Sequence, residues 1–149
     1  MLCRGTSVLD RYGADRSGLG FAGGWFRTGD LAAVADAALG YIAVVDRRKD
    51  VIVVGGENVY CSEVEEALAK HPAVLEAAVF GMPEEVLGES VNAAAVLARP
   101  CGAVELQKHC AATLAGYKVP TSIAFYDALP KTGSGKVKKG PLRLSLIHI

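Results

Sequence analysis

The chain has 149 residues, enough for one domain or slightly more. Its 16 basic and 16 acidic residues cancel, so no net field favours nucleic acid or a membrane surface as a partner. Hydrophobic residues make up 51% of the sequence, which favours a packed core over disorder. No apolar run reaches the roughly 20 residues of a membrane span, and the first residues lack the apolar core of a signal peptide. We therefore expect a cytoplasmic protein with no transmembrane segment.

The first 30 residues are rich in glycine and turn-forming residues. Within them, GLGFAG (18–23) fits the G-x-G-x-x-G pattern of dinucleotide-binding loops. The residues before it do not predict a strand and those after it do not predict a helix, so no helix N-terminus would face a pyrophosphate. We expect no dinucleotide site here.

Two short strands are predicted within 31–46, around a turn near Ala38–Gly40. The charged segment RRKD (47–50) breaks the pattern. A third strand, VIVV (51–54), is rich in β-branched residues and ends at the pair Gly55–Gly56.

A helix is predicted after this pair. Ser62 can cap its first turn and Glu65, three residues later, completes a capping box. His71–Pro72 ends the helix. One apolar face is formed by Val64, Ala67 and Leu68.

The remaining predicted elements are strands at 73–82 and 90–98, a helix at 103–115 and a strand at 122–129. A loop with Pro83 and Gly88 would separate the first two strands. Gly116 would stop the helix, whose apolar face consists of Leu106, Cys110 and Leu114. This order predicts an α+β fold, a mixed sheet with helices on one face.

The domain organisation follows from these elements. Residues 1–46 are β and turns only, too few to bury a core, and we interpret them as the edge of a larger N-terminal domain. Residues 47–50 would form a hinge and 51–143 a small domain. The last six residues, LSLIHI (144–149), turn abruptly apolar and read like a translated sequencing adapter. We expect a non-native tail on a gene fragment.

The cysteines Cys3, Cys61, Cys101 and Cys110 show no CxxC spacing and no nearby histidine pattern. Reduced thiols are the simplest interpretation, and we expect no metal site.

The stretch PKTGSGKVKK (130–139) carries Lys136 behind a run of small residues. It is not a P-loop, because Pro130 replaces the first glycine and Val137 replaces the final hydroxyl residue. A lysine at the tip of a flexible loop can stabilise charge that develops on a phosphoryl or carboxylate oxygen. A solvated lysine in a basic run is the alternative, which this stretch alone favours.

Two further segments could carry chemistry. In GWFRTGDLA (24–32), Asp30 follows a tight turn, where its carboxylate suits a sugar diol or merely caps its own backbone. Gly55 and Gly56 leave room for a thin ligand, or simply form a turn.

Together these segments resemble, in order and spacing, the AMP-forming acyl-CoA synthetase and adenylate-forming ligase superfamily. Its C-terminal third reads G-W-[FY]-[RK]-T-G-D-L, then D-R-x-K-D-x-I-x-x-G-G-E-N-V-x-P-x-E-V-E, then L-P-x-T-x-x-G-K-x-x-[KR]. The corresponding stretches here are GWFRTGDL (24–31), DRRKDVIVVGGENVYCSEVE (46–65) and LPKTGSGKVKK (129–139). Cys61 stands where the family usually has proline.

The resemblance implies a role for each candidate. Asp30 would bind the ribose hydroxyls of ATP and of the acyl-adenylate, and Arg47 would contact the nucleotide near its ribose and phosphate. Lys49 matches the hinge about which the small lid domain rotates. Gly55–Gly56 matches the glycines that line the pantetheine tunnel. Lys136 matches the lysine that orients the substrate carboxylate and the α-phosphate.

The implied protein is an ATP-dependent carboxylate–CoA ligase that forms an acyl-adenylate and pyrophosphate and then transfers the acyl group to coenzyme A, with a fatty acid as the favoured substrate. The phosphate loop, the magnesium ligands and the acyl pocket would lie in the N-terminal domain upstream, so this chain alone should be inactive. Two alternatives stay open: an adenylation domain that loads a carrier protein, and a non-catalytic lid-like binding domain.

Overall fold

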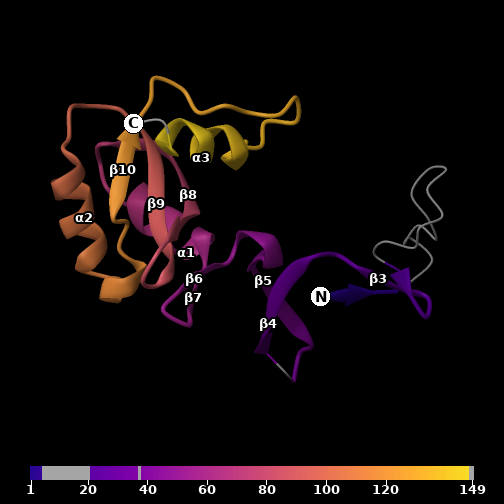
Figure 1. Ribbon diagram of the computed structural model, residues 1–149. Coiled ribbons are helices and arrows are strands. Elements are labelled where there is room, and N and C mark those ends of the chain that lie inside the picture. Colours follow the sequence, from indigo (N-terminus) through magenta and orange to yellow (C-terminus); the bar gives the residue numbers. More distant parts are fainter. Residues whose placement is uncertain (5–20, 37, 148–149) are drawn as a thin grey trace. The chain divides into compact units, whose positions relative to one another are not determined.

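The computed structural model describes residues 1–4, 21–36 and 38–147, which form two compact units, Met1–Lys49 (unit 1) and Asp50–Ile149 (unit 2). Figure 1 follows the chain from unit 1, in indigo and violet, to unit 2, in magenta to yellow. The start of the GLGFAG stretch, residues 18–20, lies outside the described residues. No helix among the described residues is long and apolar enough to cross a membrane.

Unit 1 is built from strands alone in its described part, apart from the start of a short 3₁₀ turn at its end. One antiparallel sheet has the order β1-β3-β2, with β1 at Leu2–Cys3, β2 at Phe21–Ala22 and β3 at Trp25–Arg27. A separate hairpin pairs β4 (Asp30–Asp36) with β5 (Tyr41–Arg47). This hairpin confirms the two strands predicted within 31–46.

Unit 2 holds one mixed sheet in the order β10-β9-β6-β7, with β8 paired to β9. The strands are β6 (Ile52–Val54), β7 (Glu57–Val59), β8 (Val74–Glu84), β9 (Gly88–Leu97) and β10 (Ser122–Phe125). The helices are α1 (Cys61–Ala69), α2 (Ala103–Ala111) and α3 (Lys139–Ile147). Short 3₁₀ turns cover Arg48–Asp50 and Gly116–Lys118. The antiparallel hairpin β8–β9 and the parallel pair β9–β10 make this an α+β unit, as predicted.

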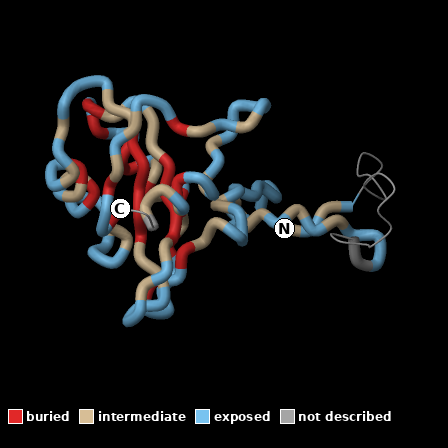
Figure 2. The backbone as a smooth tube through the Cα atoms, turned by 45° about the horizontal axis from the view of Figure 1, so that its top comes forward, coloured by how far each residue is buried: buried red, intermediate tan, exposed pale blue. Residues whose placement is uncertain are grey.

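The core of unit 2 has two layers because side chains on successive strand residues point to opposite faces of the sheet. Val79 of β8 packs in a cluster with residues of α1 and α2, whereas its neighbours Ala78 and Phe80 pack with Leu142 of α3. Figure 2 shows the buried residues concentrated along these strands. The predicted apolar face of α1 is confirmed by the burial of Val64, Ala67 and Leu68.

Helix α3 was not predicted, and it corrects the expectation of helices on one face only. Gly140–Pro141 looks like a helix breaker, yet both residues lie in the first turn of α3. The first N–H groups of a helix have no intrahelical acceptor, so proline is tolerated there. Leu142 then buries its side chain to 1% exposure on the sheet face opposite α1 and α2.

The predicted capping box is wrong. Helix α1 starts at Cys61 with Tyr60 as its N-cap residue, so Ser62 lies inside the first turn. The Glu65 Oε1 accepts a hydrogen bond of 2.9 Å from the Val79 amide of β8, so this carboxylate joins helix α1 to the sheet.

Several predicted boundaries also shift. Pro83 and Gly88 belong to the long strands β8 and β9 instead of a loop. Helix α2 ends at Ala111, before Gly116, which begins a 3₁₀ turn. Strand β7 is not predicted, because a glycine pair is typical of the end of a strand; in the structure the pair joins two strands of a tight hairpin.

Candidate functional site

Lys136 lies on a closed hairpin between β10 and α3. Lys131 and Val137 form an antiparallel bridge, and the Thr132 amide donates a 2.7 Å hydrogen bond to the Lys136 carbonyl. The Lys138 amide donates to the Pro130 carbonyl at 2.7 Å. We call residues 130–138 the lysine hairpin. These main-chain hydrogen bonds close the segment into a hairpin, whereas the small residues predict a flexible loop.

The tip of the lysine hairpin explains its composition. Gly135 adopts a φ of 82°, a left-handed conformation that favours glycine. Thr132 Oγ1 accepts the Lys136 amide at 3.1 Å and lies 2.9 Å from the Ser134 hydroxyl oxygen. The Lys136 side chain is exposed. The sequence KTGSGK thus builds a hydrogen-bonded turn that presents one lysine to solvent.

Asp30 and Arg47 are brought together in unit 1. They are direct partners in the β4–β5 register, and Arg47 Nε lies 3.7 Å from Asp30 Oδ1. The Asp30 amide donates to Thr28 Oγ1 at 3.1 Å, so the threonine hydroxyl accepts the hydrogen bond within this turn. The Asp30 carboxylate faces the guanidinium group, which leaves the pair suited to bind a diol beside a phosphate.

Lys49 is exposed on the 3₁₀ turn Arg48–Asp50, next to the boundary between the two units. The Arg48 amide donates to the Gly29 carbonyl of unit 1 at 2.8 Å. The Asp50 carbonyl accepts the Cys61 thiol of unit 2 at 2.8 Å. Each neighbour of Lys49 is therefore tied to a different unit.

Gly55 and Gly56 form the two-residue turn between β6 and β7. Their φ angles of 58° and 89° match a type I′ hairpin turn, which by itself requires glycine-like residues. The Gly55 amide donates to the Leu87 carbonyl at 2.9 Å, and a side chain at Gly55 would approach Leu87 to 3.3 Å. The glycine pair thus packs against the tip of the β8–β9 hairpin.

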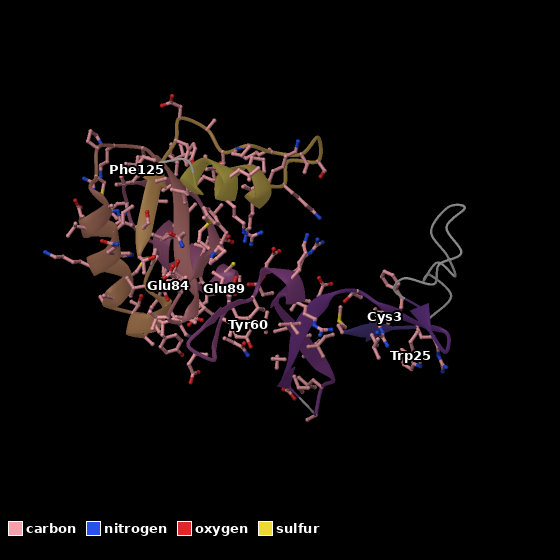
Figure 3. The ribbon with its side chains drawn as sticks, viewed as in Figure 1. Cys3, Trp25, Tyr60, Glu84, Glu89 and Phe125 are labelled. Carbon is pink, nitrogen blue, oxygen red and sulfur yellow. The ribbon has the colours of Figure 1, made fainter. Side chains whose placement is uncertain are left out.

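A cavity of about 510 Å³ lies beside this tip, between the β8–β9 hairpin and the segment 116–121. Glu84 and Glu89 mark the hairpin end in Figure 3, and both carboxylates are engaged with backbone amides, Glu84 with Leu87 and Glu89 with Val53. The wall is mostly apolar or aromatic and includes Val54, Leu87, Val91, Tyr117 and Val119. No local pattern predicts this cavity, because its walls come from segments that are far apart in the chain.

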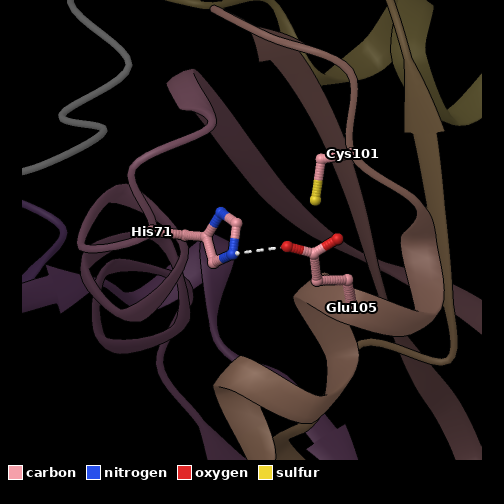
Figure 4. Close-up of side chains that lie close together, drawn as sticks. All are labelled: His71, Cys101 and Glu105. Carbon is pink, nitrogen blue, oxygen red and sulfur yellow. Dashed lines mark ion pairs between the residues drawn. The ribbon is translucent and has the colours of Figure 1, made fainter.

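His71, Cys101 and Glu105 form a cluster that was also not predicted, with ligand-type atoms within 4.8 Å of one another (Figure 4). His71 Nδ1 accepts the Ala73 amide at 3.2 Å, so in the neutral ring the proton sits on Nε2, which lies 3.5 Å from Glu105 Oε1. Burial and a hydrogen bond to Glu105 raise the pKa of the Cys101 thiol. A protonated nitrogen and a protonated thiol suit a structural contact between the turn after α1 and the N-terminal end of α2 better than a metal centre.

The structure divides the candidates between the units. Asp30 and Arg47 meet in unit 1, whereas Gly55, Gly56 and Lys136 lie on two separate turns of unit 2. Within the described residues, unit 1 offers a carboxylate–guanidinium pair, and unit 2 offers an exposed lysine and a cavity.

Comparison with known proteins identifies the class of this arrangement. Residues 63–136 match the family model of the AMP-binding enzyme C-terminal domain. The chain is 41% identical to the peroxisomal trans-cinnamate:CoA ligase of Petunia hybrida over 94% of its length, and 46% identical to the long-chain-fatty-acid–CoA ligase of Yersinia pestis over 80%. It covers 25% and 21% of those proteins.

The fold agrees with this match. The o-succinylbenzoate CoA synthetase of Bacillus subtilis, solved with its acyl-adenylate intermediate, superposes with a TM-score of 0.86 at 39% identity, over 97% of this chain and 29% of that one. The unit with Lys136 is thus the small α+β domain of adenylate-forming enzymes. The chain belongs to the AMP-forming acyl-CoA synthetase and adenylate-forming ligase superfamily, and it spans about a quarter of the length of these relatives.

Proposed function

We propose that this chain is the C-terminal part of an ATP-dependent carboxylate–CoA ligase. In the first half-reaction, a carboxylate oxygen attacks the α-phosphorus of ATP and pyrophosphate leaves, which gives an acyl-adenylate. In the second, the thiol of coenzyme A attacks the acyl carbon and AMP leaves. The observation that carries the proposal is the exposed Lys136 on a hydrogen-bonded hairpin of a separate unit, within a chain that matches CoA ligases.

Lys136 would act in the first half-reaction only. Its ammonium group can offset the negative charges of the substrate carboxylate and the α-phosphate as these two groups approach each other. Asp30 would hold the ribose hydroxyls, and Arg47, paired to it at 3.7 Å, would contact the nucleotide near its ribose and phosphate. We place the magnesium ligands and the acyl pocket outside this chain, in an N-terminal domain of the same polypeptide.

We propose that residues 47–50 act as the hinge between the edge of the large domain, 1–46, and the lid, which begins at residue 51. Support comes from the hydrogen bonds around Lys49, which tie Arg48 to unit 1 and Asp50 to unit 2. A rotation at Lys49 would change few of these contacts. It would withdraw Lys136 after adenylation and bring Gly55–Gly56 toward the pantetheine arm.

We propose coenzyme A as the acceptor, because it is the acceptor in the names of the Petunia and Yersinia relatives. The cavity beside the β8–β9 hairpin tip is adjacent to Gly55 through the contact of Gly55 with Leu87, and its wall includes the aromatic ring of Tyr117, which suits a flat or thin ligand. A carrier protein would present a similar pantetheine arm and would in addition need a docking surface for its protein part. Tyr117→Ala should therefore raise KM for coenzyme A about tenfold, the energy of one aromatic stacking contact, and leave adenylation unchanged. An unaltered KM would favour the carrier-protein alternative.

For the acid, we propose a fatty acid, the substrate class in the name of the Yersinia relative. The alternative class is an aryl acid, as in the name of the Petunia relative. Competition between a long-chain fatty acid and cinnamate in the longer protein that carries this chain would decide between them.

A hybrid ligase tests the proposed activity. In it, residues 1–143 replace the matched segment of the B. subtilis synthetase. We expect the hybrid to show carboxylate-dependent ATP–pyrophosphate exchange and thioester formation, and the 149-residue chain alone to show neither. A folded hybrid that lacks both half-reactions, or robust exchange by the chain alone, would contradict the proposal.

A further inference from the structure

The lysine hairpin is attached to unit 2 through both of its arms. On the first arm, Lys131 Nζ lies 2.9 Å from Glu76 Oε1 of β8. Directly after the second arm, Lys139 Nζ lies 3.0 Å from Glu65 Oε1 of α1. The two pairs differ in exposure: the Lys131 side chain is 45% exposed and that of Lys139 is 19% exposed. Exposed ion pairs stabilise little, so the Lys139–Glu65 pair is the stronger anchor.

Glu65 is itself held in place. Its Oε1 accepts the Val79 amide of β8 at 2.9 Å in addition to facing Lys139. One carboxylate therefore joins three elements: helix α1 that carries it, strand β8 through Val79, and the start of α3 through Lys139. Removing either charge would leave the other partly buried without its counter-charge, which is costly.

The surroundings of Lys139 keep it charged. Burial alone would lower the pKa of its ammonium group, but Cys61, Glu65 and Asp50 together raise that pKa above its ordinary value. Cys61 and Asp50 are linked by the 2.8 Å hydrogen bond from the thiol to the Asp50 carbonyl. The N-terminal turn of α1 thus connects the residue after Lys49 with the residue at the base of the lysine hairpin.

An apolar layer completes the attachment. Leu129 precedes the hairpin and Leu142 follows it. Both are buried in one cluster with Phe80, and Val137 of the hairpin packs against this cluster. The apolar contacts fix where the hairpin sits on the sheet. They are not directional, so they leave the angle of its second arm to the Lys139–Glu65 pair.

We propose that Lys139 and Glu65 are positioning residues that fix the direction in which the lysine hairpin presents Lys136. Lys136 is then held rigidly on unit 2. Lys136 approaches and leaves the reaction centre because the whole unit moves, and not because the hairpin bends. The inference rests on the proposed function only for its catalytic consequence; its structural part is tested on the chain alone.

The test is amide hydrogen exchange on the 149-residue chain, wild type against Lys139→Met. We expect the amides of Thr132, Lys136 and Lys138, which close the hairpin, to exchange at least tenfold faster in the variant. The amides of β9 should keep their protection. Lys139→Arg retains the charge and should behave as wild type. Lys138→Met, which alters an exposed lysine of the same arm, is the matched control and should also leave exchange unchanged.

Two results would overturn the proposal. One is unchanged hairpin exchange in Lys139→Met with β9 still protected. The other is loss of β9 protection both in Lys139→Met and in the milder Glu65→Gln, which would show that the pair supports the whole unit and not the hairpin. Faster hairpin exchange in Glu65→Gln with β9 intact would support the proposal even if Lys139→Met does not fold.

The catalytic consequence has a separate measurement in the hybrid ligase. Lys139→Met should slow adenylation at least tenfold and leave thioester formation from supplied acyl-adenylate within about twofold, with Lys139→Arg restoring adenylation. If Lys136→Ala has no effect on adenylation, the proposed function fails, yet the exchange result still decides the positioning role. If Lys136→Ala slows adenylation but Lys139→Met does not, the positioning role fails alone.

Discussion

Asp30 and Arg47 lie on one hairpin and Lys136 lies on another, and these two hairpins are built in opposite ways. The β4–β5 hairpin holds Asp30 and Arg47 at its open end, and its apolar side chains are largely exposed in the described structure: Val34, Tyr41, Ile42 and Val44 each exceed half exposure. The lysine hairpin is flanked by Leu129 and Leu142, which are both buried. The first hairpin has an exposed apolar surface of the kind that packs against another layer. The second hairpin is packed within its own unit.

The two units differ in how their apolar side chains are covered. Unit 2 has its own two-layered core, on which the lysine hairpin that carries Lys136 is packed. Unit 1 offers apolar strand faces of the kind that pack against another layer. We propose that the larger domain of the ligase provides that layer.

The largest expected effect on stability lies in the anchored region. Leu142→Ala should lower the free energy of unfolding of unit 2 by about 2–5 kcal/mol, because Leu142 is fully buried and the substitution leaves a cavity. Urea unfolding followed by helical circular dichroism reports on unit 2, since α1, α2 and α3 all belong to it.

The matched control is Ile42→Ala in the β4–β5 hairpin. Ile42 is 56% exposed, so we expect the free energy of unfolding to change by no more than about 0.5 kcal/mol in the same urea unfolding experiment. Equal losses for the two substitutions would show that the contrast between the hairpins is not real.

The next effect concerns the boundary between the units. In the hybrid ligase, Lys49→Pro should slow one half-reaction about 100-fold and leave the rate of the other unchanged. Proline fixes φ at this residue, so the lid can no longer reach one of its two positions correctly. Arg48→Ala beside it keeps normal backbone freedom and should leave the ratio of the two half-reactions unchanged. Normal turnover in Lys49→Pro would count against a hinge at this residue.

The smallest effect is a pH dependence within unit 2. The hydrogen bond to Glu63, at 2.8 Å, raises the pKa of Lys118, although partial burial opposes the shift. A folded-state pKa above the unfolded value means that the contribution is complete below the unfolded pKa of about 10.4 and is lost as pH rises through the folded pKa. Lys118→Met should cost about 0.2–1 kcal/mol at neutral pH, and this difference should shrink at higher pH.

The exposed Lys108 provides the control for this titration. Lys108→Met should show no comparable change in stability between neutral and alkaline pH. A difference for Lys118→Met that stays constant through the titration would mean that packing, and not the ion pair with Glu63, supplies the effect.

The sequence predicted those features that depend on local patterns. The β-branched strand before the glycine pair and the apolar face of α1 with Val64 and Leu68 were found because period and composition report them directly. Helix α3 is not predicted because Gly140–Pro141 is typical of a helix break, although proline is tolerated in the first turn of a helix.

The contacts that position the lysine hairpin join segments that are far apart in the chain. Glu65 was read as a capping residue, whereas it binds Val79 and Lys139, and no local rule reports partners at that separation. Both Glu65 and Lys139 lie within the motifs that resemble the superfamily, but the motifs do not indicate that these two residues form an ion pair. The roles of Asp30, Arg47, Lys49 and Lys136 stay predictions that kinetics must test.

The most direct test of the account is the effect of Lys136→Ala on each half-reaction of the hybrid ligase, with Lys138→Ala as control. We predict a loss of about 10²–10³ in carboxylate-dependent adenylation, the usual cost of removing a group that stabilises developing charge, and thioester formation from supplied acyl-adenylate within about threefold of wild type. An equal loss in both half-reactions, or none in adenylation, would contradict the assignment of Lys136.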